Sequence, residues 1–218
     1  MSLRSRLALA AVLLLALFAL DAWWALSGMS DAVDHYALVW LRDPGDARTL
    51  IVPGWTLQLA IAITSIGGAA IRVPIAVLGV IGLYVSGRRR EAIALFVAVA
   101  SAAAVLPLIK IGFARARPDL IWQLVHEGKP SFPSGHALGA AVTFPLLGLL
   151  STKKGALWIG LGVALLIGLS RVFLGVHWLS DVLGGWLLAA AWVCATLAIL
   201  GTRPDEPASS VRGASSTG

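Results

Sequence analysis

Residues 170–181 read SRVFLGVHWLSD and place Arg171, His177 and Asp181 in one short polar stretch between two strongly apolar runs. Burying charge in lipid is costly, so ionisable residues beside membrane segments usually serve a function and need partners. His177 and Asp181 are four residues apart, a spacing that puts two side chains on one face of a helix. A carboxylate bonded to one ring nitrogen would leave the other nitrogen free as a nucleophile. The stretch therefore indicates a chemical role, with a plain salt bridge at a helix start as the simpler alternative.

The rest of the chain has the composition of a membrane protein. Of its 218 residues, 58% are hydrophobic and only 13% are charged, and its mean hydropathy is +0.86. A soluble domain usually carries about a quarter charged residues. The formal net charge of +6 could suit nucleic acid, but the positive charges stand in short clusters between apolar runs. We therefore expect an integral membrane protein with no nucleic-acid partner.

Apolar runs predict the spans, since a transmembrane helix needs about 20 mostly apolar residues. Six runs qualify, near residues 5–26, 66–87, 91–112, 135–152, 155–173 and 180–201. We expect an all-α polytopic fold with one membrane domain over residues 1–202. Residues 203–218 are polar and rich in small residues, so we expect them to form a disordered cytoplasmic tail. The N-terminal run has no convincing cleavage site and is predicted to remain as the first helix.

Residues 49–71 are ambiguous because they carry no charge and could form a further span. The positive-inside rule places the basic residues near the N-terminus on the same side as the RRR at 88–90, which requires two intervening spans. Residues 31–43 and 53–65 are therefore predicted to be interfacial helices on the far side. The second span is expected to begin near Ser65.

The same reasoning leaves a group of positive charges on the outer side, against the rule. These residues are Lys110, Arg115, Arg117, Lys129 and Arg171. Both termini are expected in the cytoplasm, with the chain in the inner (plasma) membrane and the outer charges on its periplasmic or extracellular side. Positive charge that topology does not explain indicates an anion-binding site.

Two further segments belong to this outer side. KIGFARARP, residues 110–118, places Lys110 and Arg117 seven residues apart, so that they can share a face at a helix end, while Pro118 disfavours helix at Arg117. PSGH, residues 133–136, begins the expected fourth span, where free backbone N–H groups can bind an anion. In PSGH, Ser134 adds a hydroxyl, Gly135 allows close approach and His136 adds a titratable proton. Headgroup contacts and a simple helix cap are the alternatives.

The three segments together fit a known pattern: K, six residues and RP; PSGH; and SR, five residues, H, three residues and D. With these motifs the chain resembles the type 2 phosphatidic acid phosphatase superfamily, in its membrane-integrated lipid phosphatase branch. The resemblance implies a phosphatase that uses a phosphohistidine intermediate and no metal or other cofactor. It implies that His177 attacks phosphorus, Asp181 orients His177, and His136 protonates the leaving oxygen. The residues expected to hold the phosphate are Lys110, Arg117, Ser134, Gly135 and Arg171.

Other functions stay open at this stage. His136, His177 and Asp181 could ligate a metal ion, although three nearby cations would repel it. The superfamily also contains soluble acid phosphatases, which six spans disfavour, and vanadate-dependent haloperoxidases, which the motifs alone do not separate. A lipid-phosphate transporter or binding protein should carry its polar residues at helix midpoints, whereas here they collect at helix ends.

The expected partners are a lipid phosphate and the bilayer, and the oligomeric state is open. Candidate substrates are undecaprenyl diphosphate, phosphatidate, phosphatidylglycerol phosphate and a lipid A phosphate. We expect undecaprenyl or another isoprenyl diphosphate, since that lipid is presented at the outer face. Arg115 and His126 match no motif position, and His126 is expected to be a solvated loop residue.

Overall fold

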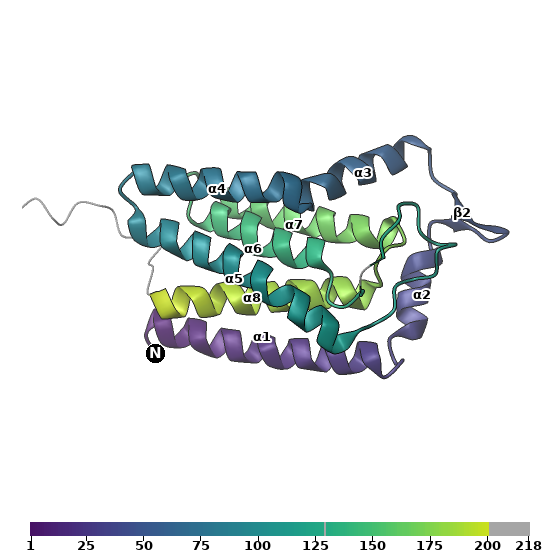
Figure 1. The fold of residues 1–218 in the computed structure, drawn as a ribbon, viewed down its shortest axis with the longest axis horizontal. Coiled ribbons are helices and arrows are strands. Elements are labelled where there is room, and N and C mark those ends of the chain that lie inside the picture. The colour runs from purple at the N-terminus through teal and green to yellow at the C-terminus, as the bar shows by residue number, and fades with distance from the viewer. Residues whose placement is uncertain (129, 201–218) are drawn as a thin grey trace, which may run out of the picture.

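The computed structural model describes residues 1–128 and 130–200 as a bundle of long helices with a short hairpin at one end (Figure 1). The helices are α1 (Leu3–Leu26), α2 (Asp31–Val39), α3 (Trp55–Gly67), α4 (Ala69–Val85), α5 (Arg89–Phe113), α6 (Gly135–Leu149), α7 (Ala156–Phe173) and α8 (Leu179–Leu200). The hairpin pairs β1 (Arg42–Asp43) with β2 (Asp46–Leu50) in antiparallel fashion.

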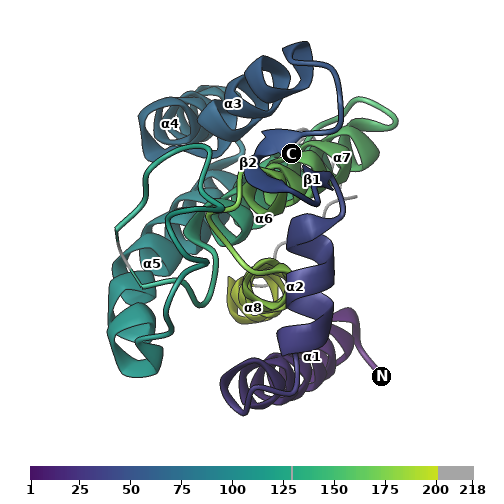
Figure 2. The ribbon, with the colours of Figure 1, turned by 90° about the vertical axis from the view of Figure 1, so that its right-hand side faces the viewer.

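The core lies around α6 and α8, because these two helices are covered by their neighbours. In the most apolar 18-residue stretch of each helix, 50% of α8 is buried but only 11% of α1. Fully buried side chains such as Leu95, Val142 and Leu146 form one cluster with Leu188 of α8. Figure 2 shows α1 and α8 side by side on one flank and the α3–α4 pair on the opposite flank. The outer helices present their apolar side chains away from the protein, as lipid contact requires.

The number of spans is only partly resolved by helix length. Within the described residues, four helices are long and apolar enough to cross a membrane: α1, α5, α7 and α8. Helices α3 and α4 together are also long and apolar enough to form one span, bent by 47°, which gives up to five spans. Helix α6 is apolar but has 15 residues, fewer than a span usually needs. The expected six spans therefore stay a prediction.

The chain is mostly helical, as predicted, but residues 42–50 form the hairpin. The helix expected over 31–43 ends at Val39, and Arg42 is buried in β1, where it donates to the carbonyl oxygens of Phe173 (2.8 Å) and Trp122 (3.2 Å). The intervening DPGD sequence favours a tight turn, in which Asp43 accepts from the backbone N–H of Gly45. The buried arginine and the turn together replace the last part of the expected helix.

A helix boundary is present near Ser65, as expected. Helix α3 ends at Gly67, Gly68 is extended, and α4 begins at Ala69. Helix α3 packs along α7. It extends beyond the start of α4 at an angle, since the two helices are bent by 47° relative to each other (Figure 1). The interfacial position of α2 and α3 stays a prediction.

The charges are divided between the two ends of the bundle as expected. The N-terminus and the α4–α5 connection lie at one end, where Arg4 reaches the carbonyl oxygen of Ile199. Helix α2, the hairpin and the 114–128 segment lie at the other end (Figure 1). The second end carries the cations of the three motifs, and we name it the motif end. The predicted tail over 203–218 lies outside the described residues.

Candidate active site

His177 and Asp181 are in contact, although His177 lies before α8 and not on it as predicted. Helix α8 begins at Leu179, and the positive φ of Gly175 turns the chain towards it. The Nδ1 atom of His177 lies 3.2 Å from Oδ2 of Asp181, which also accepts from the backbone N–H of Trp178 at 2.9 Å. Both side chains are buried. The carboxylate therefore fixes the imidazole ring in one orientation.

The second ring nitrogen of His177 is left for chemistry. Arg117 Nη1 lies 3.1 Å from Nε2, and because a guanidinium can only donate, Nε2 must carry a lone pair. The ring proton then sits on Nδ1 and faces Asp181. Ser131 donates to the same carboxylate and lies 3.3 Å from Nδ1. Burial lowers the pKa of His177 to about 3, so the ring is neutral and nucleophilic at physiological pH.

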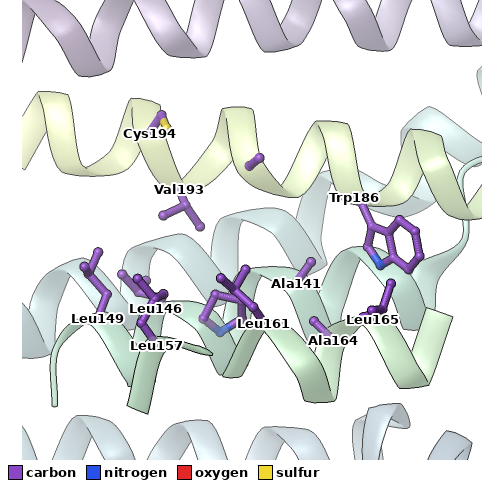
Figure 3. A pocket seen from close by; sticks show the side chains of 12 residues that line it. Ala141, Leu146, Leu149, Leu157, Leu161, Ala164, Leu165, Trp186, Val193 and Cys194 are labelled. Atoms are coloured by element: carbon purple, nitrogen blue, oxygen red, sulfur yellow. The ribbon is translucent and has the colours of Figure 1, made fainter. Parts of the chain in front are cut away.

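His177 borders a charged cavity of about 570 Å³ at the motif end. Its polar lining residues are Arg72, Lys110, Arg117, Glu127, His136 and His177, and Gly135 contributes backbone. A second cavity, of about 540 Å³ between α6, α7 and α8, is lined by hydrocarbon side chains apart from the indole nitrogen of Trp186 and the sulfur of Cys194 (Figure 3). Only the first of these two cavities can bind an anion, and we name it the charged cavity.

Lys110 and Arg117 both line the charged cavity, but they do not lie on a shared helix face as predicted. Ala114 adopts a left-handed conformation and ends α5, so Arg117 lies beyond the helix and shares no helix face with Lys110. Lys110 Nζ donates to the carbonyl oxygens of Pro130 and Ser131. The lysine therefore ties α5 to the segment that precedes α6.

Ser134 and Arg171 are close to the charged cavity without lining it. The Ser134 hydroxyl caps α6 by accepting from Ala137 N at 3.5 Å, and its backbone N–H donates to the carbonyl oxygen of Asp181 at 2.8 Å. Arg171, in the last turn of α7, donates to Thr64 Oγ1 and to Glu127 Oε1, each at 2.8 Å. Ser134 thus aligns α6 with α8, and Arg171 reaches the cavity through Glu127.

Glu127 is a site residue that the sequence reasoning missed. Its carboxylate lies 2.8 Å from Arg171 and 3.8 Å from Arg117, two expected phosphate ligands, and its side chain is 30% exposed. Burial favours the neutral acid, but the two guanidinium groups prevail and lower the pKa of Glu127. The Glu127 carboxylate therefore bridges the two arginines in the free protein. The only hint in the sequence was one acidic residue within a basic segment.

Arg115 was predicted only as one of the outer-side cations, and Asp34 was missed. Arg115 Nη1 donates to Asp181 Oδ1 at 2.8 Å, and its Nη2 donates to Asp34 Oδ2 at 2.9 Å. Asp34, which is 1% exposed, also accepts from the Ser180 backbone N–H at 2.9 Å. These contacts join α2 to the start of α8, and we name them the Arg115 clamp. Nothing in the spacing of the sequence connects Asp34 with Asp181.

The site therefore combines a neutral, carboxylate-oriented histidine, a second histidine and a cationic cavity, which is the equipment of phosphoryl transfer. In the part of the chain that the structure describes, no group of three His, Cys, Asp or Glu side chains is arranged to hold a metal ion. A family model described as "PAP2 superfamily" matches residues 91–205. The chain belongs to the PAP2 superfamily.

Individual relatives agree with this assignment. The chain is 33% identical over 151 residues to phosphatidylglycerophosphatase B of Bacillus subtilis, covering 65% of this chain and 74% of that protein. It is 46% identical over 71 residues to an undecaprenyl-diphosphatase of Sulfolobus acidocaldarius, covering 31% of this chain and 33% of that protein. It is 31% identical over 118 residues to a lipid A 1-phosphatase of Rhizobium johnstonii, covering 50% and 47%.

The fold also matches a solved structure. The crystal structure of a transmembrane PAP2 type phosphatidylglycerolphosphate phosphatase from Bacillus subtilis superposes with a TM-score of 0.71 at 28% identity, covering 87% of this chain and 94% of that chain. The protein is a multi-pass membrane lipid phosphatase of the PAP2 type.

Proposed function

We propose that the protein hydrolyses a lipid phosphate or diphosphate at the outer face of the inner membrane through a phosphohistidine at His177. The observation that carries this proposal is the orientation of His177. Its Nδ1 faces Asp181 and its Nε2 accepts from Arg117 at the charged cavity. A neutral nucleophile next to cations is the arrangement that attack on a phosphate anion needs.

In the first half-reaction, Nε2 of His177 attacks phosphorus and forms an N–P bond while the bond from phosphorus to the leaving oxygen breaks. His136 donates a proton to that oxygen and the dephosphorylated lipid leaves. Asp181 stabilises the positive charge that develops on the ring. Lys110 and Arg117 stabilise the phosphoryl oxygens, and the backbone at Gly135 lets them approach closely.

In the second half-reaction, His136 takes a proton from a water molecule, whose oxygen attacks phosphorus. The N–P bond breaks, inorganic phosphate is released and neutral His177 is restored. His136 and His177 can share these steps because both line the charged cavity. In the described residues, the side chain of His136 makes no hydrogen bond to another part of the protein, so its ring is available to the substrate. Arg171 joins the phosphate ligands when the phosphate displaces Glu127.

Two substrates are favoured by different observations. An isoprenyl diphosphate such as undecaprenyl diphosphate fits a site at the outer face, as the sequence led us to expect. Phosphatidylglycerophosphate is favoured because the relative named phosphatidylglycerophosphatase B aligns over 65% of this chain. Both lipids carry a terminal phosphate that hydrolysis can remove and a second phosphate that stays on the lipid.

The first test measures inorganic phosphate released by the purified protein in detergent, with excess EDTA throughout. Undecaprenyl diphosphate, phosphatidylglycerophosphate and phosphatidate are assayed side by side, with His177→Ala as the blank and His126→Ala as a matched control. We expect EDTA-resistant release that is lost in His177→Ala and kept in His126→Ala. Loss of activity in EDTA would overturn the metal-free mechanism, and no release from any of the three lipids would overturn the proposed substrates.

The intermediate has its own test. A substrate with ³²P in the terminal phosphate is mixed with the protein and quenched in alkali within one turnover. We expect protein-bound label that is stable to alkali, labile to acid and absent in His177→Ala. Label that resists acid would indicate a phosphoester and would contradict attack by histidine.

A further inference from the structure

Arg72 is a charged residue near the start of α4, in an otherwise apolar helix, and it belongs to none of the three motifs. It lines the charged cavity together with His136 and His177. Its Nε lies 3.3 Å from the carbonyl oxygen of Gly67 and its Nη1 lies 3.4 Å from Thr143 Oγ1, long distances for a charged donor. Within residues 1–128 and 130–200, no carboxylate lies within salt-bridge distance of Arg72. An anionic group on a bound ligand would stabilise a guanidinium placed in this way, because an unpaired charge inside a membrane protein is costly.

Arg72 lies on the His136 side of the charged cavity. A Cβ atom on Gly139, one turn after His136 on the same face of α6, would meet the guanidinium carbon of Arg72 at 2.5 Å. A Cβ atom on Gly68, just before α4, would lie 3.7 Å from Nε2 of His136. The start of α4 therefore packs against His136, whereas Arg117 is the cation in contact with His177. The absence of a side chain at Gly139 makes the space that the guanidinium occupies.

The geometry of the proposed reaction indicates which part of the substrate lies next to Arg72. The attacking nitrogen and the leaving oxygen lie roughly in line on opposite sides of phosphorus. Since His177 attacks and His136 protonates the leaving oxygen, the part of the substrate that continues beyond this oxygen lies next to His136. That part is the retained lipid moiety, and Arg72 is the cation beside it. A guanidinium binds a phosphate through two parallel hydrogen bonds.

We propose that Arg72 binds a second phosphate group, the one that stays on the lipid after hydrolysis. This inference rests on the proposed function and deepens it. The retained phosphate can adjoin the leaving oxygen, as in a prenyl diphosphate, or be separated from it by a glycerol unit, as in phosphatidylglycerophosphate. Phosphatidate has only the phosphate that is removed and cannot use Arg72. Arg72 thus makes the enzyme prefer lipids with two phosphate groups.

The test compares Arg72→Gln and Arg72→Lys with the wild type on the three lipids, in the same detergent micelles. Arg90→Gln is the matched control, since Arg90 is an exposed arginine at the opposite end of the bundle. For Arg72→Gln we expect kcat/KM to fall about tenfold or more on at least one two-phosphate lipid, which corresponds to about 1.4 kcal/mol. On phosphatidate we expect Arg72→Gln to stay within about twofold of the wild type, a difference of under half a kcal/mol. Arg72→Lys should restore part of the loss, because it keeps the charge.

The outcomes separate this inference from the proposed function. A loss on the diphosphate alone or on phosphatidylglycerophosphate alone supports the inference and gives the spacing between the two phosphates. Equal losses on all three lipids, or no loss on any, overturn it even though the wild type is active. If the wild type is inactive on every lipid, the proposed function itself fails. The ³²P label formed from phosphatidate by Arg72→Gln shows that the variant is folded and that its His177 still reacts.

Discussion

The charge on single residues in the free protein determines how the site receives an anion. His177 is neutral because it is buried, whereas Glu127 is ionised because two arginines flank it. As the proposed nucleophile, His177 therefore needs no deprotonation step before attack. In the proposed reaction, by contrast, the two arginines must exchange the Glu127 carboxylate for the phosphate.

The lowered pKa of His177 predicts an unusual pH dependence of its protonation and of the stability of the fold. Its pKa of about 3 lies far below that of an ordinary histidine, so we expect the ring to stay neutral from about pH 8 down to about pH 5. Below the pKa of the unfolded chain, near 6.5, only the unfolded state takes up this proton. The stability that the folded protein gains from keeping His177 neutral is thus complete above about pH 6.5 and is lost as the pH falls towards 3.

The measurement is ¹⁵N NMR of histidine-labelled protein over this pH range. The resonances of His177 are assigned by their absence in His177→Gln, and the remaining histidines serve as internal references. A ring that titrates near its ordinary pKa would contradict the burial of His177 in the free protein.

Glu127 is expected to compete with the substrate for Arg171 and Arg117. Glu127→Gln should strengthen inhibition by orthovanadate, a phosphate analogue, by roughly threefold to tenfold, or about 0.7–1.4 kcal/mol. The inhibition constant is measured with one lipid substrate, and Glu91→Gln at the opposite end is the control. Weaker inhibition in Glu127→Gln would show that the carboxylate positions the arginines more than it competes with the anion.

The motif residues could be predicted from the sequence because their types and spacings are local. The partners that organise them could not. Ser180 and Asp34 are 146 positions apart, and Arg171 and Glu127 are 44 apart, so only the packing of the helices brings them together. Arg72 is similar, since its meaning depends on Gly139 of another helix. Each role assigned to a motif residue stays a prediction until the variants are measured.

Between elements, the Arg115 clamp holds the first turn of α8 against α2. Removing one partner from a buried ion pair typically costs about 3–5 kcal/mol, because a charge is left uncompensated. Arg115→Gln should therefore lower the melting temperature. It should also lower kcat more than it changes KM, since Arg115 touches Asp181 and does not line the charged cavity.

The control for the Arg115 clamp is Arg88→Gln, which removes an ion pair with Glu91 at the other end of the bundle. Arg115→Lys should restore part of kcat. A raised KM with unchanged kcat in Arg115→Gln would instead make Arg115 a substrate ligand.

Element boundaries followed the sequence wherever an apolar run was uninterrupted. Helices α1, α7 and α8 begin and end within a few residues of the expected spans. The prediction failed at the end of the helix expected over 31–43, which stops at Val39 because a buried arginine and a turn sequence follow it. At the 47° bend between α3 and α4, Gly67 lies close to Ile167 and His136, a proximity that no local sequence pattern records.

For the whole molecule, the orientation in the bilayer is the property that decides which leaflet supplies the substrate. We expect the motif end to face outward and the α4–α5 connection to face the cytoplasm. In a Cys194→Ser background, Leu120→Cys should react with an impermeant maleimide on intact cells, and Arg89→Cys should react only after lysis. Both positions are exposed in the structure. The reverse pattern would place the site at the inner leaflet.

The walls of the charged cavity differ in a way that affects what happens after catalysis. Towards the bilayer the cavity is bordered by apolar residues of α4 and α5, among them Ala69, Pro107 and Ile111, the last of which is 71% exposed. Towards the motif end it is bordered by Arg117, Glu127 and Pro130. We therefore expect the two products to leave by different routes: the lipid diffuses laterally into its leaflet, and inorganic phosphate leaves into water. A high phosphate concentration in the water at the motif end would then slow turnover by refilling the cavity from the aqueous side, however quickly the lipid had diffused away.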